Sequence, residues 1–368
     1  MMFKLGLYGC GNRTKALLNA LRHDDFYKVH ALYDLNTGSA VKLAERFGGK
    51  VCTSEEDLFR DKEIDAFMIS LNPLYHKEVL KKIIPLGRPV FIEKPVAFTG
   101  EDVRLLADLA EKHKVFVQVG FMRRYLPSTL AALEYMKTHD PGRIYSIACN
   151  WFHMNQVETN FWGRRDPGNF RLQLSQIPYH TCHMLDIMCL MGGPVKEVYS
   201  IMIEETHREY PSPNDLIGNI IFSSGINGNF HYASTSYYHE LSYRFHSENY
   251  GIKLAVDLNK KVLIYKKPRF VTSELGPDPD DPRHDFNSFN THFHLHTSPC
   301  TINYDTNELV IADENIMYDF VRMVRDNLPP WADLRSAVRT QGLAEALELS
   351  GREKRLIKMD PDGVPILK

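Results

Sequence analysis

A lysine that directly follows a short apolar segment is the residue of this chain best suited to proton chemistry. The segment 90–92 is apolar, and Glu93, Lys94 and Pro95 follow it at once. A short apolar run between two prolines is typical of a buried parallel strand, and ligands of open α/β sheets bind at the carboxyl ends of such strands. A lysine beside an apolar wall suits proton transfer or the polarisation of an oxygen. Alternatively, Glu93 and Lys94 form only a solvated strand end.

A glycine-rich turn near the start of the chain predicts an anion-binding site. The turn joins an expected strand at 3–8 to an expected helix at 15–21. In this arrangement the free N–H groups and the dipole of a helix N-terminus favour a pyrophosphate. Thr14 occupies the third glycine position of the G-x-G-x-x-G pattern, which leaves open how closely the helix approaches the strand. The turn consists of Gly9, Cys10, Gly11, Asn12 and Arg13.

An acidic residue at the end of the second expected strand predicts the choice of cofactor. Asp34 follows the strand expected at 29–33 and lies 23 residues after Gly11. A carboxylate at about this distance can accept both ribose hydroxyls of NAD, and it would repel the 2′-phosphate of NADP. Asp34 could instead cap the helix that is expected to begin at Thr37. We expect NAD in preference to NADP.

The order of the expected elements divides the chain into two domains. Up to about residue 120, strands and helices alternate, which predicts an α/β Rossmann domain with a parallel, doubly wound sheet. Beyond residue 142 the pattern changes to strands separated by turn signals, which predicts an α+β domain with a large, mainly antiparallel sheet. We therefore expect an NAD-binding domain at 1–122 and a substrate-binding and oligomerisation domain at 123–368. The final helices, expected at 313–327 and 335–350, could pack back on the first domain.

Composition excludes several classes of protein. The chain has 368 residues, 43% of them hydrophobic and 24% charged, with a net charge of −2. These values suit a soluble two-domain protein and favour neither nucleic acid nor an anionic membrane as a partner. No apolar run approaches the roughly 18 residues of a membrane span, and the N-terminus leads directly into an expected strand, so we expect no signal peptide and a cytoplasmic location. The six cysteines are expected to be reduced core residues.

Several motifs together resemble one family of oxidoreductases. They are the glycine-rich turn at 9–13, Tyr33-Asp34, the segment 72–76, Glu93-Lys94-Pro95 and the segment 120–125. This set resembles the glucose–fructose oxidoreductase / inositol dehydrogenase / rhizopine-catabolism MocA family, although the usual Pro-Asn order appears here as Asn72-Pro73. The resemblance implies a Rossmann domain, a second domain whose open sheet often forms the subunit interface, and NAD(P)-dependent chemistry on a sugar or polyol. It implies cofactor contacts from Gly9, Cys10, Gly11, Asn12, Arg13, Asp34, Ser70, Asn72, His76, Glu93 and Lys94.

The segment 176–186 carries the second group of chemical residues. His183 and Asp186 are three residues apart and share a face if the segment is helical. The family carries an aspartate four residues before this histidine, where this chain has Tyr179. A tyrosine hydroxyl is a much weaker acid than a carboxyl group, so Tyr179 acts as a base only with help from a cation such as Lys94; otherwise it shapes the pocket. The resemblance implies catalytic roles for Lys94 and His183, and Tyr179, at the position of the family aspartate, is the third catalytic candidate.

Aromatic and basic stretches could complete a pocket for a sugar. Trp151-Phe152-His153 and the segment 160–165 suit stacking against sugar rings and binding of carboxylates, but packing in a subunit interface explains them equally well. His76 could be a core residue rather than a cofactor contact. His292, His294 and His296 would share one face of a strand, yet no carboxylate is spaced to complete a metal site, so we expect no metal. The expected substrate-binding residues are Arg124, Trp162, Arg165, Tyr179, His180 and His183.

The sequence thus predicts an NAD-dependent dehydrogenase that acts on a hydroxyl or keto carbon of a sugar or polyol. His183 is expected to be the acid/base and Lys94 the group that polarises the oxygen. An NAD-dependent glycosidase that uses transient oxidation is a second hypothesis, because Tyr179 replaces the family aspartate. A ligand-binding relative without turnover is a third. A homo-oligomer, dimer or tetramer, is expected because an open sheet would leave a large apolar face uncovered.

Overall fold

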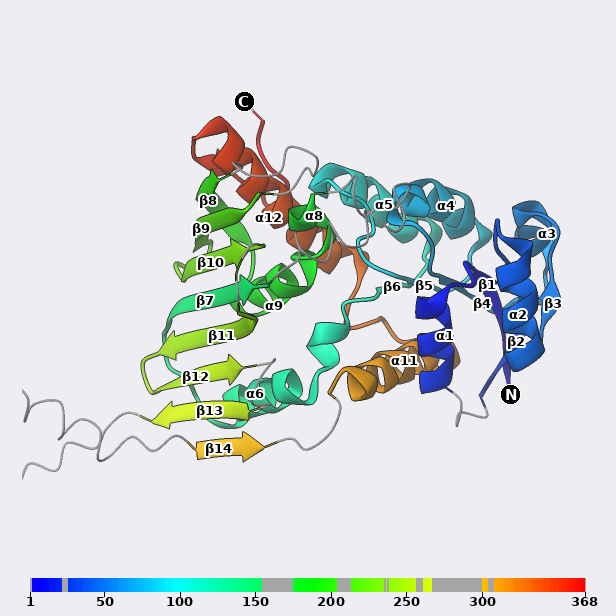
Figure 1. Ribbon diagram of the computed structural model, residues 1–368, viewed down its shortest axis with the longest axis horizontal. Coiled ribbons are helices and arrows are strands. Elements are labelled where there is room, and N and C mark those ends of the chain that lie inside the picture. Colours follow the sequence, from blue (N-terminus) through cyan, green and yellow to red (C-terminus); the bar gives the residue numbers. More distant parts are fainter. Residues whose placement is uncertain are drawn as a thin grey trace, which may run out of the picture.

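The chain folds into two sheets with their helices (Figure 1). Each sheet has its own hydrophobic core. The computed structural model describes residues 2–21, 26–153, 175–203, 213–234, 236, 238–255, 261–266, 300–303 and 308–367. Within these ranges, no helix is both long enough and apolar enough to cross a membrane.

The first domain contains a six-stranded parallel sheet with the order β3-β2-β1-β4-β5-β6. Its strands are β1 (Phe3–Tyr8), β2 (Tyr27–Tyr33), β3 (Lys50–Val51), β4 (Ala66–Ile69), β5 (Val90–Ile92) and β6 (Val117–Val119). Strands β4 and β5 are buried throughout, which explains their continuous apolar sequence. The strand order reverses direction between β1 and β4, and in doubly wound sheets the crevice at such a switch point is where ligands bind. The predicted Rossmann fold is confirmed.

Side-chain caps at the helix starts explain where several helices of this domain begin. The helices are α1 (Asn12–Ala20), α2 (Thr37–Phe47), α3 (Glu55–Arg60), α4 (His76–Ile83) and α5 (Gly100–His113), with the 3-10 turns η1 (Pro73–Tyr75), η2 (Ile84–Leu86) and η3 (Met122–Tyr125). The side chains of Asn36, Ser54 and Thr99 accept a backbone N–H in the first turns of α2, α3 and α5. Each cap satisfies a donor that the helix itself leaves unpaired.

The second domain is built on a nine-stranded sheet with the order β14-β13-β12-β11-β7-β10-β9-β8-β15. The strands are β7 (Ile144–Phe152), β8 (Val195–Ile203), β9 (Asp215–Phe222), β10 (Asn227–Ala233), β11 (Glu240–Ser247), β12 (Tyr250–Ala255), β13 (Lys261–Lys266), β14 (Cys300–Asn303) and β15 (Ile357–Lys358). β7 and β10 run parallel, and the other neighbouring strands are antiparallel. The predicted mainly antiparallel sheet is confirmed, with β14 and β15 as strands that the sequence pattern did not predict.

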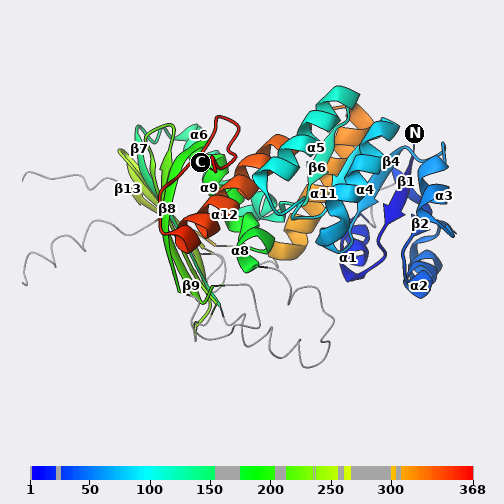
Figure 2. The same ribbon diagram turned by 90° about the horizontal axis from the view of Figure 1, so that it is seen from above.

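One face of this sheet is covered by helices and the other is exposed. The helices of the second half are α6 (Pro127–Thr138), α8 (Gln176–Tyr179), α9 (Cys182–Gly192), α11 (Glu308–Asp326) and α12 (Leu334–Glu353). Figure 2 shows α9 and α12 on the same side of the sheet. Burial alternates along β8 and β9, so large apolar side chains on the opposite face are open to solvent. These are Tyr199, Ile201, Ile203 and Ile217.

The C-terminal helices pack against the first domain, so elements from the two ends of the chain contact each other. From α11, the Phe320 ring contacts Phe3 and Phe91 edge-on, with ring centroids 6.3 and 5.8 Å apart, and Ile316 is fully buried in the same core. Helix α12 crosses α5 closely, because a Cβ placed on Gly100 would lie 2.9 Å from the Cα of Gly342.

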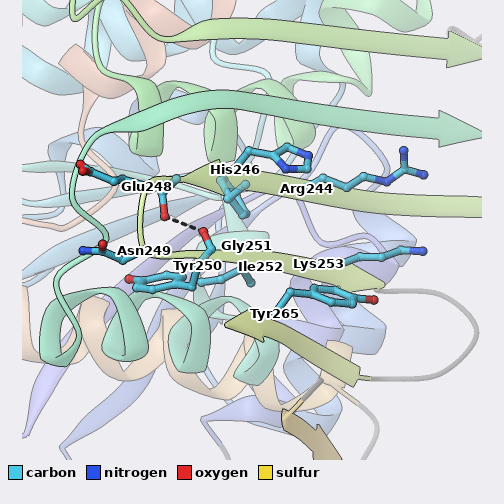
Figure 3. Close-up of a pocket in the computed structure, with 11 residues that line it drawn as sticks. Arg244, His246, Glu248, Asn249, Tyr250, Gly251, Ile252, Lys253 and Tyr265 are labelled. Atoms are coloured by element: carbon cyan, nitrogen blue, oxygen red, sulfur yellow. Dashed lines mark hydrogen bonds between the residues drawn. The ribbon is translucent and has the colours of Figure 1, made fainter. Parts of the chain in front are cut away.

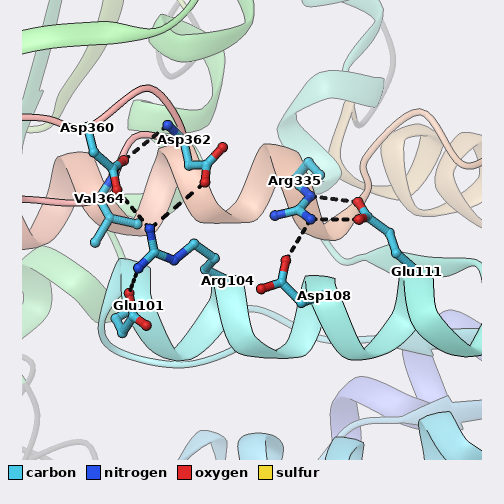
Figure 4. Close-up of polar contacts among 8 residues, drawn as sticks. All are labelled: Glu101, Arg104, Asp108, Glu111, Arg335, Asp360, Asp362 and Val364. Carbon is cyan, nitrogen blue, oxygen red and sulfur yellow. Dashed lines mark hydrogen bonds and ion pairs between the residues drawn. The ribbon is translucent and has the colours of Figure 1, made fainter.

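Two arginines join α5 to the C-terminal segment at its surface (Figure 4). Arg104 of α5 bonds Asp360 at 2.8 Å and also pairs with Glu101 of its own helix. Arg335 of α12 reaches back to α5 and pairs with Glu111 at 2.7 Å. These groups are partly exposed, so each ion pair contributes little stability by itself, but together they fix how the helices align.

Candidate active site

A cavity of about 690 Å³ lies at the carboxyl ends of β1, β2 and β4, at the switch point of the first sheet. Its walls include Gly9, Gly11, Asn12, Arg13, Asp34, Ser70 and Asn72, which the sequence predicted as cofactor contacts. Tyr8, Leu35 and Tyr75 also line it. Leu35 is 79% exposed and Tyr75 is 54% exposed, which leaves apolar surface at the rim for a flat aromatic group.

The glycine-rich turn leaves the N-terminus of α1 open. Gly9 has φ +95°, and a Cβ placed there would lie 2.1 Å from the backbone oxygen of Ser70, so only glycine fits. Gly11 is the N-cap of α1, and a Cβ placed there would meet no atom within 4 Å. Thr14 is fully buried, and its hydroxyl donates to the Gly9 oxygen at 2.7 Å. A threonine at the third glycine position is therefore accommodated by this hydrogen bond, and the open helix N-terminus can receive an anion.

Asp34 is held in place by the backbone around it. Its Oδ2 accepts the Cys10 N–H at 2.7 Å, and its Oδ1 accepts the Asn36 N–H at 2.8 Å. These bonds tie the turn after β1 to the end of β2, and they orient the carboxylate at the cavity wall. Burial, with a smaller effect of the Asp34 charge, raises the pKa of Cys10 to about 12, so this thiol stays neutral. A glycine cradle, an open helix N-terminus and a fixed carboxylate together fit the pyrophosphate and ribose of a dinucleotide.

Arg13 and Glu93 form a partly buried link between three elements. The Arg13 Nε donates to Glu93 Oε1 at 2.6 Å, and its Nη1 donates to Asp313 Oδ2 of α11 at 2.7 Å. The second oxygen of Glu93 accepts the Lys94 N–H at 3.1 Å. Gly120 lies against the same carboxylate, because a Cβ placed there would be 2.9 Å from Glu93 Oε2. Glu93 thus fixes the backbone from which Lys94 projects.

Lys94 reaches from the end of β5 to the second domain. Its Nζ donates to the backbone oxygen of Tyr179 at 3.3 Å and lies 4.8 Å from the centroid of the Tyr179 ring. Within the part of the chain that the structure describes, no carboxylate lies within 4.0 Å of this nitrogen. The ammonium is therefore held by a carbonyl dipole and an aromatic face rather than by a neutralising charge.

His183 lies in the first turn of α9, near Lys94, and is almost completely buried. His183 is 7% exposed, and its Nδ1 has no hydrogen-bond partner among the described residues. Burial holds the pKa of His183 well below its usual range, and the positive charges of Lys94 and Arg123 lower it further. The ring is therefore neutral at pH 7 and able to accept a proton.

Arg124 occupies a different place from the one predicted. It was expected to bind substrate, but it is only 3% exposed and forms a two-pronged ion pair with Asp186, with Nε and Nη2 at 2.7 and 2.6 Å from the two carboxylate oxygens. Its Nη1 donates to the Trp331 oxygen at 2.7 Å. A guanidinium enclosed in this way joins η3, α9 and the segment before α12, so its role is structural.

Aromatic and imidazole rings pack together near His183. His180 has its ring centroid 6.4 Å from that of His183 and 4.8 Å from that of Trp151, which it meets edge-on. His153 stacks on Trp151 at 4.1 Å. Burial lowers the pKa of His153 to about 3, with a contribution from His239. The cluster forms a wall of aromatic and imidazole rings near the end of β7.

The remaining predicted residues have structural contacts or lie outside the described ranges. His76 is fully buried, with ring nitrogens 2.7 Å from the Pro95 oxygen and 3.1 Å from the Leu71 oxygen, which supports the core role rather than cofactor contact. Asn72 caps η1 while it lines the cavity. Trp162, Arg165 and the histidines at 292, 294 and 296 fall outside the described residues. Among those described, no group of three ligands could hold a metal ion.

A second hollow lies on the exposed face of the large sheet, over β11, β12 and β13 (Figure 3). It has a volume of about 470 Å³, and Arg244, His246, Lys253 and Tyr265 are among its lining residues. None of the predicted site residues lies there. This hollow shares the face that carries the exposed apolar side chains of β8 and β9.

Sequence comparison finds a family model that matches the first domain. Residues 3–121 match the family described as "Oxidoreductase family, NAD-binding Rossmann fold". The rhizopine catabolism protein MocA of Rhizobium meliloti is 29% identical over 147 residues, which cover 40% of this chain and 46% of that protein. Inositol 2-dehydrogenase 2 of Saccharopolyspora erythraea is 33% identical over 150 residues, which cover 39% of this chain and 42% of that protein. The chain thus matches less than half the length of these two relatives.

Solved structures share the fold over nearly the whole chain. A levoglucosan dehydrogenase in complex with NADH and levoglucosan aligns with a TM-score of 0.80 at 15% identity, and the alignment covers 98% of this chain and 100% of that one. The WlbA dehydrogenase of Bordetella pertussis, in complex with NADH and UDP-GlcNAcA, aligns with a TM-score of 0.74 at 18% identity and covers 98% and 99% of the two chains. At these identities the likeness shows a common fold.

Proposed function

We propose that this protein is an NAD-dependent dehydrogenase of a sugar or polyol and a member of the glucose–fructose oxidoreductase / inositol dehydrogenase / MocA family, because residues 3–121 match the model of an NAD-binding oxidoreductase family. The observation that carries the proposal is that Lys94 lies near enough to the buried His183 to lower the pKa of its imidazole. Glu93, the residue before Lys94, bonds Arg13 of the cavity wall at 2.6 Å. The two residues come from different domains; among the described residues Lys94 has no carboxylate partner, and His183 is buried and neutral. Such a pair suits the oxidation of an alcohol.

The roles of the two residues follow from their charges. NAD, when bound, supplies the hydride acceptor. Lys94 is cationic and lies close enough to His183 to lower the pKa of the imidazole, so its ammonium can stabilise the negative charge that develops on a substrate oxygen. His183 is neutral and can take the proton of the hydroxyl. The net reaction converts a secondary alcohol and NAD⁺ to a ketone, NADH and a proton.

Tyr179 shapes this pair rather than replacing the missing carboxylate. Its contacts with Lys94 are made by the backbone oxygen and by the ring face. Neither contact uses the phenolic oxygen, so Lys94 is positioned by Tyr179 without any need for an ionised hydroxyl. We therefore assign Tyr179 to the pocket wall.

The substrate class is supported by the relatives and by the ring wall. Proteins similar to this chain include inositol 2-dehydrogenases, a glucose-6-phosphate 3-dehydrogenase and a structural neighbour that binds levoglucosan. The rings of Trp151, His153 and His180 offer flat faces and ring nitrogens, which suit the C–H faces and hydroxyl groups of a cyclic polyol.

The exposed face of the large sheet supports a homo-oligomer. Four large apolar side chains of β8 and β9 lie on this face, between 39% and 63% exposed, and the hollow over β11 to β13 lies on the same face beyond β10 and β7. An apolar surface of this kind is typical of a protein interface. We propose that a second copy of the chain covers it.

A substrate screen tests the function directly. Purified protein is mixed with NAD⁺ and, separately, with myo-inositol, levoglucosan or glucose 6-phosphate, and NADH formation is followed by absorbance at ~340 nm, with the rate expected near the ordinary enzyme range of about 1–10³ s⁻¹. The Lys94→Met variant serves as the control for contaminating activity. Release of an aryl leaving group from an aryl glycoside without net NADH would instead support the glycosidase hypothesis. Failure of NAD⁺ to bind at all would overturn the assignment.

A further inference from the structure

The dinucleotide cavity continues beyond Asp34, on the side away from Lys94. Asp34 directly follows β2, whereas Lys94 lies just beyond β5, on the other side of the switch point between β1 and β4. A dinucleotide that crosses this point with its nicotinamide near Lys94 and a ribose at Asp34 has its adenine on the β2 side of the sheet. Strand β3 lies outside β2 at this edge, and α3 follows it (Figure 1).

Glu55 and Lys82 form an ion pair in the wall of this part of the cavity. Glu55 is the first residue of α3 and Lys82 lies in the last turn of α4, so the pair joins the two helices. The Lys82 ammonium donates to Glu55 Oε1, and the Tyr8 hydroxyl donates to Glu55 Oε2 at 2.9 Å. Tyr8 is the last residue of β1 and is only 8% exposed, so its hydroxyl is a fixed donor that orients the carboxylate.

The Glu55 carboxylate is ionised and accessible from the cavity. Its side chain is 19% exposed. Burial acts to raise the pKa of Glu55, but the hydrogen bonds from Lys82 and Tyr8 outweigh this effect and hold the pKa below its usual value. Among the described residues each carboxylate oxygen accepts one hydrogen bond, although each has two lone pairs. The carboxylate can therefore accept a further hydrogen bond from a group in the cavity.

Apolar side chains line the same part of the cavity. Leu35 comes from the loop after β2, and Tyr75 comes from η1, which precedes α4. Both are largely exposed, and they offer an aliphatic and an aromatic surface for the faces of a flat ring. The ion pair of Glu55 and Lys82 adds an acceptor and a donor beside each other, which suits the edge of such a ring.

We propose that Glu55 and Lys82 recognise the edge of the adenine ring of NAD, with Glu55 accepting the 6-amino group and Lys82 donating to the neighbouring ring nitrogen N1. This inference rests on the proposed function, because it requires that the cavity hold NAD. The edge of adenine presents a donor beside an acceptor, and a carboxylate beside an ammonium is its complement. Hypoxanthine presents an oxygen and an N–H at the same two positions. The pair should therefore reject a dinucleotide that carries hypoxanthine.

The test compares two cofactors that differ only at this edge. Nicotinamide hypoxanthine dinucleotide has the charge, the riboses and the nicotinamide of NAD⁺, but it carries an oxygen in place of the amino group. The dissociation constants of both are measured by isothermal titration calorimetry on the full chain, without substrate. The wild-type protein should bind the analogue at least about fivefold more weakly than NAD⁺, because the loss of a hydrogen bond to a charged group costs at least this factor.

Two substitutions in α3 separate recognition from charge. Glu55→Gln should reduce the preference for NAD⁺ to less than about twofold, because an amide can donate to an oxygen as readily as it accepts from an amino group. Glu56→Gln is the matched control, since it makes the same change of charge at the next residue, which is exposed and does not belong to the cavity wall. It should keep the wild-type preference. A general effect of charge would alter the affinity for both cofactors equally and leave their ratio unchanged.

The outcomes distinguish adenine recognition from the function on which it rests. A wild-type preference below about fivefold, or a preference that Glu55→Gln leaves unchanged, would overturn the role of the pair while the binding of NAD⁺ stands. Should Glu55→Gln fail to fold, as judged by thermal melting, Lys82→Met decides, because this side chain is 54% exposed and loss of its donor should lower the preference at least about threefold. An unchanged preference in Lys82→Met would also overturn the role of the pair. A wild-type protein that binds neither dinucleotide overturns the proposed function itself.

Discussion

Replacing Lys94 by methionine should separate catalysis from cofactor binding. Methionine keeps the length and apolar stem of the lysine but removes the ammonium that contacts the Tyr179 oxygen and ring. Lys94 does not line the dinucleotide cavity, whose wall is formed by the glycine-rich turn and Asp34. The affinity for NAD⁺ should therefore stay within about threefold, whereas loss of a positioned acid–base or polarising group reduces turnover by about 10²–10⁴. That range equals about 3–5 kcal/mol of transition-state stabilisation at 25 °C.

The assay for Lys94→Met uses two readouts on one protein. Intrinsic fluorescence titration gives the dissociation constant of NAD(H), and NADH absorbance gives kcat with the polyol found in the screen. Lys137→Met is the matched control, because Lys137 is an exposed lysine of α6, with a side chain that is 79% exposed. If Lys94→Met binds NAD⁺ normally and turns over at the wild-type rate, Lys94 is not the group that polarises the substrate oxygen. If it loses NAD⁺ binding by more than about tenfold, Lys94 belongs to the cofactor site instead.

Four further predictions test individual parts of the fold and the site. Asp34→Ala should weaken NAD⁺ binding and narrow its preference over NADP⁺, measured by titration with both cofactors; equal affinities in the wild type would contradict this. Tyr179→Phe should keep at least about half of the wild-type kcat, because its contacts with Lys94 do not use the hydroxyl; a loss of ~10² or more would show that the phenol acts in catalysis. Gly342→Ala should lower the free energy of unfolding by about 1–3 kcal/mol or more in urea titrations, because its Cβ would lie 1.8 Å from the Gly363 oxygen; an unchanged midpoint would mean that the C-terminal segment moves aside. Ile201→Glu should reduce the molar mass seen by light scattering without lowering the melting temperature of the monomer, and a wild-type monomer at micromolar concentration would remove the oligomer proposal.

Local patterns predicted those parts of the fold that depend on short-range physics. The buried strands appeared as apolar runs, and the exposed-face strands as alternating ones, because side chains of a strand alternate between two faces. Helix starts were visible where a capping residue such as Thr99 precedes an acidic turn. β15 was not predicted because it has only two residues. Its pairing with β8 depends on where α12 ends in three dimensions, which no local pattern encodes.

The residues of the candidate site also fall into two groups: those that local sequence patterns could predict and those that they could not. Gly9, Asp34 and Lys94 could be found from the sequence because their positions relative to strand ends determine their function. Asp313 could not, since it lies 300 residues from Arg13 in the chain and no local signal marks it.

Arg123 and Arg124 show most directly what could not be predicted from the sequence, because the two residues are adjacent and chemically identical. The turn η3 directs Arg124 into Asp186, while the charge of Arg123 acts on His183. Only the three-dimensional path of the backbone distinguishes them.

The contribution of α11 to the first core has a consequence for the order of folding during synthesis. The segment that matches the family ends at residue 121, but Ile316 and Phe320 are buried in the same core, and Asp313 closes the link to Arg13. The first domain therefore cannot complete its packing on the ribosome until residue 326 has emerged, about 200 residues after its own last strand. At roughly 5–20 residues per second this delay is about 10–40 s, during which the face that α11 later covers stays exposed to chaperones. A fragment cut at the family boundary would remain in this unfinished state.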